Sequence, residues 1–507
     1  MWGTITEPER KSMKKRLLYN TIFSLLLQIC TIICGMILPR LFLVHYGSEV
    51  NGLIHSITQF LGVISFLELG VGQVIQSALY RPLADKDNDS ISKIYVSGNR
   101  YFRKIAGILA VYIVILMCLY PFVARHDFGW FYIASLVATL SINSMVQYCF
   151  GVVDRILLNA DQYCYIQCAV HIAVLLCNTG ISILMIRLEA PIQVVKLLAS
   201  LITLMSPIII HLYIKRHYRI NRRITYTEEP IKQKMNGVAQ HLSYVVLDGT
   251  DTIVLTLLST LSSVSVYSVY HMVIYGMMQL YRAAINGFHA IVGNLWAKHE
   301  IERMNQVFGC IETLLHYAVV FLFSCTAVLL LPFIRIYTDG ITDADYIQPV
   351  FAALLIFAHS FQCLRSVYNM LILAAGHYKE TQSCHIIATL LNITISVITV
   401  KYCGLIGVAI GTLAALSYQT IWMAVYDSNH LLKWPLKNFV KHIIVDLLTA
   451  GVIVIVTSKI CWNVDGYFDW FIMALLAAVI ALLTIGISAV VFYRKQFRDF
   501  RKLLKKI

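Results

Sequence analysis

Charged side chains are scarce in this sequence, at 13% of its 507 residues, about half of the roughly 25% typical of a water-soluble protein. It also lacks the Gly-x-x-x-x-Gly-Lys-Ser/Thr pattern of nucleotide-binding loops. Its 13 cysteines show no paired spacing typical of a metal site. The missing charge argues against a soluble domain, and the missing loop argues against an ATPase. The cysteines are best interpreted as apolar packing residues, so no metal site is expected.

Apolar side chains are abundant instead, with 58% hydrophobic residues and a mean hydropathy of +0.71. Runs long enough to cross a hydrocarbon core of about 30 Å recur along the whole chain. Most of them are apolar on every side, which a buried soluble core would not require. The first run, near residues 17–43, is too long for a cleaved signal peptide, and we expect it to stay as an anchor. The sequence therefore predicts an all-α integral membrane protein.

About fourteen transmembrane helices are predicted from these runs. They lie near residues 17–43, 52–79, 105–124, 129–152, 163–186, 191–214, 236–259, 264–296, 308–334, 347–373, 382–400, 404–426, 441–460 and 468–493. The longest connection divides the first six helices from the next six. The predicted domains are 1–214 (spans one to six), a cytoplasmic linker 215–235, 236–426 (spans seven to twelve), and 427–507 (two further spans and a basic cytoplasmic tail).

Lysine and arginine predict the orientation. With the N-terminus inside, 32 of the 41 basic residues fall on cytoplasmic segments, whereas the external loops hold five: Arg125, Arg187, Arg335, Lys401 and Lys459. This bias follows the positive-inside rule and places both termini in the cytoplasm, with the protein in the inner membrane. The excess basic residues behind the net charge of +14 then lie beside the anionic lipids of the inner leaflet. We expect membrane lipids as partners and no nucleic acid.

The eighth span carries one polar stripe. Its members fall within an arc of about 80° at 100° per residue: His271, Tyr275, Gln279, Arg282, Asn286, His289 and Gly293. Two interpretations compete, a wall of a wet cavity or hydrogen bonds within a packed bundle. We favour the cavity, because so many polar or small residues in register exceed what packing usually needs.

Shorter polar faces occur on the first, second and seventh spans. The first carries Gln28 and Arg40 with Pro39, which is expected to kink the helix, and the second carries His55, Gln59 and Gln73. Glu68 lies off that second stripe, so pairing with another helix is an alternative to coupling. On the seventh span, Asp248 and Asp251 share one face with Gln240 and Tyr244. These two aspartates either bind a coupling proton or cation, or pair with Arg282 structurally.

Three segments resemble a known family. They are Pro39–Leu53 (PRLFLVHYGSEVNGL), Asp251–Leu255 (DTIVL), and Val264–Tyr270 (VSVYSVY) with the Gly293-Asn294 pair and Ala297 that follow. Together with the layout of about residues 15–430, they resemble bacterial polysaccharide flippases of the O-antigen and capsule (Wzx) type. That family belongs to the multidrug/oligosaccharidyl-lipid/polysaccharide (MOP) exporter superfamily.

The resemblance implies two pseudo-symmetric six-helix lobes in a V plus two C-terminal helices, with spans one, two, seven and eight around a cavity. It implies alternating access and transfer of undecaprenyl-diphosphate-linked oligosaccharide to the outer leaflet for surface polysaccharide biosynthesis. Arg282 and Arg40 would attract the diphosphate, while His271, Gln279, Asn286 and His289 would bond sugar hydroxyls. No cofactor is implied beyond proton or cation coupling. A polysaccharide polymerase and chain-length machinery are the implied protein partners.

Other classes stay open. A membrane-embedded polymerase or glycosyltransferase is disfavoured because the external loops are short, so we expect a protein that is not an enzyme. A multidrug or cation antiporter of the same superfamily typically has twelve spans rather than fourteen. A lipid II flippase would share the fold and mechanism, and the residues do not distinguish its substrate.

Overall fold

The computed structural model describes residues 7–68, 71–123, 128–225, 238–298, 300–432, 435–460, 464–494 and 496, and within those ranges the regular structure is helical, without strands. The chain divides into two compact units, Met1–Val245 and Val246–Ile507. Eleven of the described helical segments are long and apolar enough to cross a bilayer. The expected all-α membrane fold is confirmed, and the chain is a multi-pass membrane protein.

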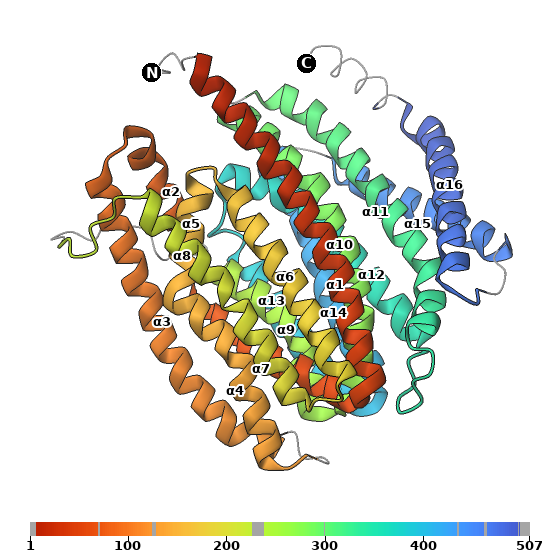
Figure 1. Ribbon diagram of the computed structural model, residues 1–507. Helices are drawn as coiled ribbons and strands as arrows, with labels where there is room; N and C mark the ends of the chain where they lie inside the picture. The colour runs from red at the N-terminus through yellow and green to blue at the C-terminus, as the bar shows by residue number, and fades with distance from the viewer. Residues whose placement is uncertain are drawn as a thin grey trace. The chain divides into compact units, whose positions relative to one another are not determined.

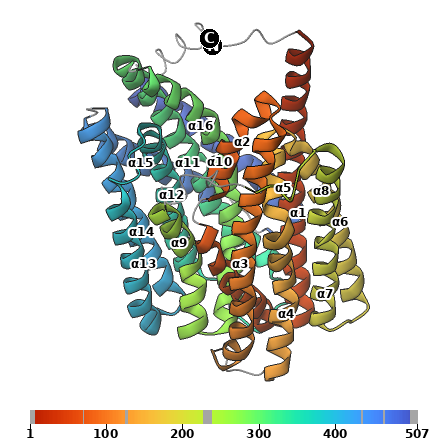
Figure 2. The ribbon, with the colours of Figure 1, turned by 90° about the vertical axis from the view of Figure 1, so that its left-hand side faces the viewer.

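The first unit is built around a long N-terminal helix. Its helices are α1 (Glu7–Gly62), α2 (Val71–Asp85), α3 (Asn88–Val123), α4 (Trp130–Val146), α5 (Val152–Ala160), α6 (Cys164–Arg187), α7 (Ile192–Thr203) and α8 (Met205–His217). The first part of α1 packs along α6, as Figure 1 shows. Ile75 of α2, Phe102 of α3 and Leu157 of α5 are fully buried in one apolar cluster. That cluster holds α2, α3 and α5 together (Figure 2).

The helix α1 breaks at Gly47, where φ is 82° and ψ is 171°. This break separates the first predicted span from the second. The second predicted span, 52–79, is not one helix. It comprises the end of α1, a 3-10 segment (Val63–Glu68) and α2. Pro39 lies inside α1, and the non-helical backbone within this helix is at Gly47, which the sequence analysis did not single out.

The second unit is entered along α9. Its helices are α9 (Val238–Leu258), α10 (Leu261–Ala297), α11 (Ile301–Tyr337), α12 (Pro349–Ala375), α13 (Gln382–Cys403), α14 (Leu405–Tyr426), α15 (Leu436–Ile460) and α16 (Tyr467–Phe492). The helices α13 and α14 run side by side, with α12 against α14 (Figure 2). The described side chains of α9 include a shorter apolar stretch, Gly249–Leu258, and α10 is not among the eleven apolar segments. Both helices carry polar stripes that the sequence predicted.

The last two helices pack on α11, which Figure 1 shows beside α15 and α16. Their contacts form three small apolar clusters along α11. Tyr317 packs with Val445 and Ala489, Val320 with Ile453 and Ala481, and Leu329 with Met473 and Ala477. The predicted cytoplasmic linker 215–235 is described as far as residue 225, and its remainder and residues 497–507 of the basic tail lie outside the described residues.

Candidate functional site

The polar stripe of α10 forms a connected ladder over about three turns. Gln279 Nε2 donates to the Tyr275 hydroxyl at 3.3 Å, and Arg282 Nη1 donates to Gln279 Oε1 at 3.4 Å. One turn earlier, the His271 and Tyr275 ring centroids lie 5.8 Å apart. The structure therefore brings together three of the predicted binding residues, His271, Gln279 and Arg282, with Tyr275 as the link.

The opposite face of α10 packs in the apolar core of the second unit. Its buried side chains are Tyr270, Ile274, Met278, Tyr281, Ile285 and Val292. Tyr270 lies edge-on against Phe351 of α12, with ring centroids 5.1 Å apart. The predicted residues Asn286, which is exposed, and His289, which is half-buried, lie further along the same stripe of α10. Within this unit, the polar stripe thus lies outside the apolar core.

A second row of polar side chains on α12 lies next to the ladder. The His359 ring centroid is 6.0 Å from that of His271, and His359 Nδ1 is 2.7 Å from Gln362 Oε1. One turn further, Arg365 donates to Gln419 of α14. Arg282 and Arg365 both lie near Cys363 of α12, so the two cations are in one region of this unit. Two guanidinium groups in one low-dielectric region favour an anionic group beside them.

Asp251 lies in a separate oxygen-rich cluster. It is 1% exposed, and its two carboxylate oxygens accept from Thr412 Oγ1 at 2.8 and 2.7 Å. The Tyr267 hydroxyl donates to the same carboxylate at 3.2 Å, and Asn392 Nδ2 donates to Thr412 Oγ1 at 3.0 Å.

The helices α13 and α14 approach closely beside this carboxylate, because a Cβ at Gly411 would overlap the Ser396 hydroxyl. Oxygen atoms of this kind suit a proton or a hard cation. Asp248 also lies on α9, but its side chain is outside what the structure describes.

The site residues predicted in the first unit lie on three helical pieces. Gln28 and Arg40 are half-buried on α1 before the Gly47 break, and His55 and Gln59 are half-buried after it. Gln73 is exposed on α2. The predicted stripe from His55 to Gln73 assumed one continuous helix. The 3-10 segment interrupts it, so the two ends do not share a helical register.

Glu68 is bound within the first unit. The Tyr148 hydroxyl donates to Glu68 Oε1 at 2.6 Å, from the π-helical turn Gln147–Gly151 between α4 and α5. Arg155 of α5 interacts electrostatically with Glu68 and donates to Gln147 Oε1 at 3.2 Å. Glu68 therefore pairs with a neighbouring helical element, the alternative that its place off the stripe suggested.

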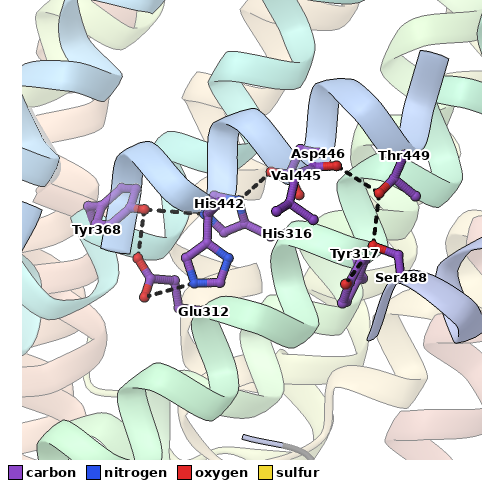
Figure 3. Close-up of polar contacts among 9 residues, drawn as sticks. All are labelled: Glu312, His316, Tyr317, Tyr368, His442, Val445, Asp446, Thr449 and Ser488. Atoms are coloured by element: carbon purple, nitrogen blue, oxygen red, sulfur yellow. Dashed lines mark hydrogen bonds and ion pairs between the residues drawn. The ribbon is translucent and has the colours of Figure 1, made fainter. Parts of the chain in front are cut away.

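The sequence interpretation missed a buried polar cluster between α11, α12 and α15, which Figure 3 shows. His316 Nδ1 is 2.6 Å from Asp446 Oδ2, and the Tyr368 hydroxyl donates to Glu312 Oε1 at 2.8 Å. His442 Nε2 is 3.6 Å from Glu312 Oε2. The sequence signal was an acid and a histidine one turn apart, Glu312 with His316 and Asp446 with His442. Among the described residues, no group of three or more His, Cys, Asp or Glu is suited to a metal ion.

No protein-family model matches the chain, and no curated sequence matches it. Solved structures do match. The lipid II flippase MurJ, in its inward closed conformation, gives a TM-score of 0.68 at 15% identity over 94% of this chain and 100% of that chain.

Two multidrug transporters match over less of the chain. An inward-facing MATE family transporter of the MOP superfamily gives a TM-score of 0.54 at 17% identity, over 79% of this chain and 94% of its own. The MATE multidrug transporter DinF-BH gives a TM-score of 0.52 at 13% identity, over 85% of this chain and 98% of its own. At these identities the likeness is one of fold: the chain folds like MurJ and like these two transporters.

Proposed function

We propose that this protein is a flippase that moves undecaprenyl-diphosphate-linked oligosaccharide from the inner to the outer leaflet by alternating access. The observation that supports it most is the extent of the match to the lipid II flippase. A match over 94% leaves 6% of 507 residues, about 30, unmatched. The helices α15 and α16, with 25 and 26 residues, cannot both lie in that remainder. The match to MurJ therefore extends past α14 into the C-terminal pair α15 and α16.

The polar ladder of α10 supplies the chemistry of recognition. The guanidinium of Arg282 presents a planar fork of donors that fits diphosphate oxygens, and Arg365 adds a second positive charge nearby. Gln279 and His271 offer donors and acceptors to sugar hydroxyls. In the first unit, Arg40 and the half-buried His55 and Gln59 are proposed as further substrate-binding residues.

The driving force need not come from a nucleotide. Moving an anionic headgroup outward is favoured by about 2.3 kcal/mol per charge for each 100 mV of inside-negative potential. We propose that a proton or cation at Asp251 contributes further, with Asp248 and Glu68 as the other candidates. Asp251 fits this role best because it is buried among hydroxyl and amide groups.

The proposed setting follows from this substrate. The protein would lie in the cytoplasmic membrane with both termini inside, would catalyse no covalent chemistry, and would supply a polysaccharide polymerase and its chain-length machinery. A lipid II flippase is the second candidate, and the match to MurJ favours it over a multidrug or cation antiporter. The antiporter and a membrane-embedded polymerase or glycosyltransferase are the remaining alternatives.

Deleting the gene tests the substrate class. We expect surface polysaccharide to disappear, while diphosphate-linked oligosaccharide accumulates on the inner leaflet, measured by lipid extraction and surface staining. Complementation with the intact gene should restore both. If surface polymer is normal and the cells become sensitive to cationic drugs, the protein is a multidrug exporter. If instead lipid II accumulates, the second candidate is correct.

A further inference from the structure

The buried polar cluster between α11, α12 and α15 contains four ionisable side chains from α11 and α15. Glu312 and His316 lie one turn apart on α11, and His442 and Asp446 lie one turn apart on α15. Glu312 is 0% exposed, His316 1% and His442 3%. Ionisable groups at this depth in a membrane protein are costly and usually functional. This cluster is distinct from the proposed transport site and from the Asp251 cluster.

The hydrogen bonds around His316 determine where protons can reside. His316 Nδ1 faces a carboxylate oxygen of Asp446 at 2.6 Å, and an ionised carboxylate only accepts, so Nδ1 carries a hydrogen. His316 Nε2 lies 3.2 Å from the Tyr368 hydroxyl, which has a single hydrogen to give. The same hydroxyl lies 2.8 Å from Glu312 Oε1. Tyr368 therefore bridges an imidazole and a carboxylate.

Two proton arrangements satisfy these three groups. In the first, Tyr368 donates to ionised Glu312, and His316 is an imidazolium that donates through Nε2. In the second, Glu312 is protonated and donates to the Tyr368 oxygen, while Tyr368 donates to neutral His316. One step connects them. The Nε2 proton of His316 passes to the Tyr368 oxygen as the Tyr368 hydrogen passes to Glu312 Oε1, with no change in the number of protons.

The surroundings favour keeping this proton. A third buried acid, Asp427 at the end of α14, is 2% exposed and lies near Glu312 and Tyr368. Removing the shared proton would leave Glu312 and Asp446 both ionised in a buried space. The second histidine also approaches Glu312, because His442 Nε2 lies 3.6 Å from Glu312 Oε2.

The remaining polar groups around the cluster do not compete for the proton. Lys441 donates to the Phe492 carbonyl at 2.9 Å on an exposed side. Tyr493 stacks on the ring of His442, with ring centroids 4.7 Å apart, and a phenol keeps its hydrogen at neutral pH. Tyr317, Thr449 and Ser488 bond to one another through hydroxyls (Figure 3).

We propose that Glu312, Tyr368 and His316 form a proton relay, oriented by Asp446 of α15, that binds one proton inside the second unit. His442, against the other carboxylate oxygen, is the next acceptor in line. The relay exists only while α15 stays on α11 and α12, since Asp446 fixes the His316 tautomer. Proton binding and the docking of α15 are therefore linked. This inference does not depend on the transported substrate.

A superficially similar cluster in the first unit lacks this property. Asp154 is 0% exposed, accepts from the Tyr95 hydroxyl, and lies 2.7 Å from His211 Nδ1. There the other imidazole nitrogen, His211 Nε2, lies 3.0 Å from Arg222 Nη2. Arginine only donates, so His211 Nε2 accepts in this arrangement. This cluster is a matched control, with the same residue types and no second arrangement.

The test measures protonation directly, on the full-length protein in lipid nanodiscs and without substrate. Infrared difference spectra and ¹⁵N-histidine NMR are recorded between about pH 5 and pH 8. In the wild type we expect a protonated-carboxyl band and the His316 nitrogen signals to change over the same pH range. Glu312→Gln should remove the band and lower proton uptake on a pH step by about one proton per chain. Tyr368→Phe should separate the two titrations.

The control variant Asp154→Asn should leave the band and the proton uptake as in the wild type. The proposal is overturned if wild-type His316 stays a single neutral tautomer with Glu312 ionised throughout that range. It is also overturned if Glu312→Gln, correctly folded, takes up as many protons as the wild type. Should Glu312→Gln not fold, the wild-type NMR titration and Tyr368→Phe, which keeps the ring, still decide the question.

Discussion

Arg282 is the residue on which the proposed substrate recognition depends most directly. It stands at the end of a ladder that His271, Tyr275 and Gln279 build along one face of α10. Gln279 is a neutral amide, so its hydrogen bond orients the guanidinium without cancelling the positive charge that would attract a diphosphate. The ladder thus positions the cation rather than neutralising it.

We predict that Arg282→Ala abolishes measurable transport while the protein still accumulates in the membrane. Losing one charge-assisted hydrogen bond costs about 1.5–3 kcal/mol, roughly a 10- to 150-fold lower rate. The measurement is surface polysaccharide and lipid-linked oligosaccharide in a complemented deletion strain. Arg282→Lys should recover only part of the activity, because it keeps the charge but not the planar fork.

Arg303→Ala is the matched control for this prediction. Arg303 pairs with Glu300 at 3.0 Å, with its side chain 61% exposed at the start of α11. An exposed pair of this kind contributes little, so we expect wild-type transport. Unimpaired transport in Arg282→Ala would remove Arg282 from the substrate site.

At the same scale, the sequence indicated residues along single helices better than residues that meet between helices. The α10 stripe was visible because its members repeat every three or four positions on one helix. The Glu312 and Asp446 pairs were not, because 134 residues separate these two acids and each pair occupies only one turn of an apolar helix. Only the packing of α15 on α11 brings the four groups together.

The break in α1 is the clearest feature at the scale of elements. Gly47 adopts φ 82° and ψ 171°, a region that residues with a Cβ avoid. Sequence reasoning placed the bend at Pro39, because proline removes a helical hydrogen bond. The glycine was present in the segment used for the family resemblance, but its backbone angle depends on how the chain re-enters the bundle. The Tyr46 hydroxyl donates to the Ala190 carbonyl at 2.6 Å beside the break.

We predict that Gly47→Ala destabilises the protein by about 1–3 kcal/mol, the usual cost of a strained backbone position. Thermal unfolding of the detergent-solubilised protein, followed by size-exclusion chromatography, measures the effect. Gly35→Ala is the control, because Gly35 lies inside α1 with no atom within 4 Å of an added Cβ. It should be neutral or slightly stabilising, since alanine favours helix. An equal change in thermal stability for Gly47→Ala and Gly35→Ala would contradict a strained backbone at Gly47.

The two faces of α10 give a second prediction at this scale. In a background without the 13 native cysteines, we expect cysteine at His271, Gln279 or His289 to react with membrane-impermeant thiol reagents. Cysteine at Met278 or Ile285, which are 2% and 3% exposed, should stay inert. The physical reason is that the polar stripe lies outside the apolar core of its unit. If cysteines at the stripe positions react as little with these reagents as the control cysteines do, the stripe is buried by helix packing.

At the scale of the whole molecule, fourteen predicted spans account for the observed helices once broken ones are counted together. The predicted second span becomes three pieces, and the sixth becomes α7 and α8, because local breaks at single residues hardly change mean hydropathy. Hydropathy therefore predicted the positions of the apolar segments better than the continuity of each helix. The basic linker 215–235 indicated a division after the sixth span, whereas the two compact units meet at Val245 and Val246, inside the predicted seventh span.

The added helices α15 and α16 raise the question of what holds them to α11. Lipid tails are as apolar as leucine, so contacts such as those of Val320 and Leu329 give little net attraction inside a membrane. The buried polar cluster is different, because Glu312 and His316 would face lipid without α15. We predict that a chain ended after Leu432 fails to accumulate in the membrane, measured by quantitative immunoblotting. A chain ended after Gln496, which keeps both helices, should accumulate normally.

A rescue experiment identifies the cause of that loss. Replacing the two polar residues in the shortened chain, as Glu312→Leu with His316→Leu, removes the groups that would be stranded in lipid. We expect this double variant to recover accumulation at least severalfold, because burial of polar groups in lipid is the main cost. If the shortened chain stays absent with leucine at both positions, apolar packing on α11 holds the C-terminal helices. Recovery of protein without recovery of transport would show that α15 and α16 serve function as well as assembly.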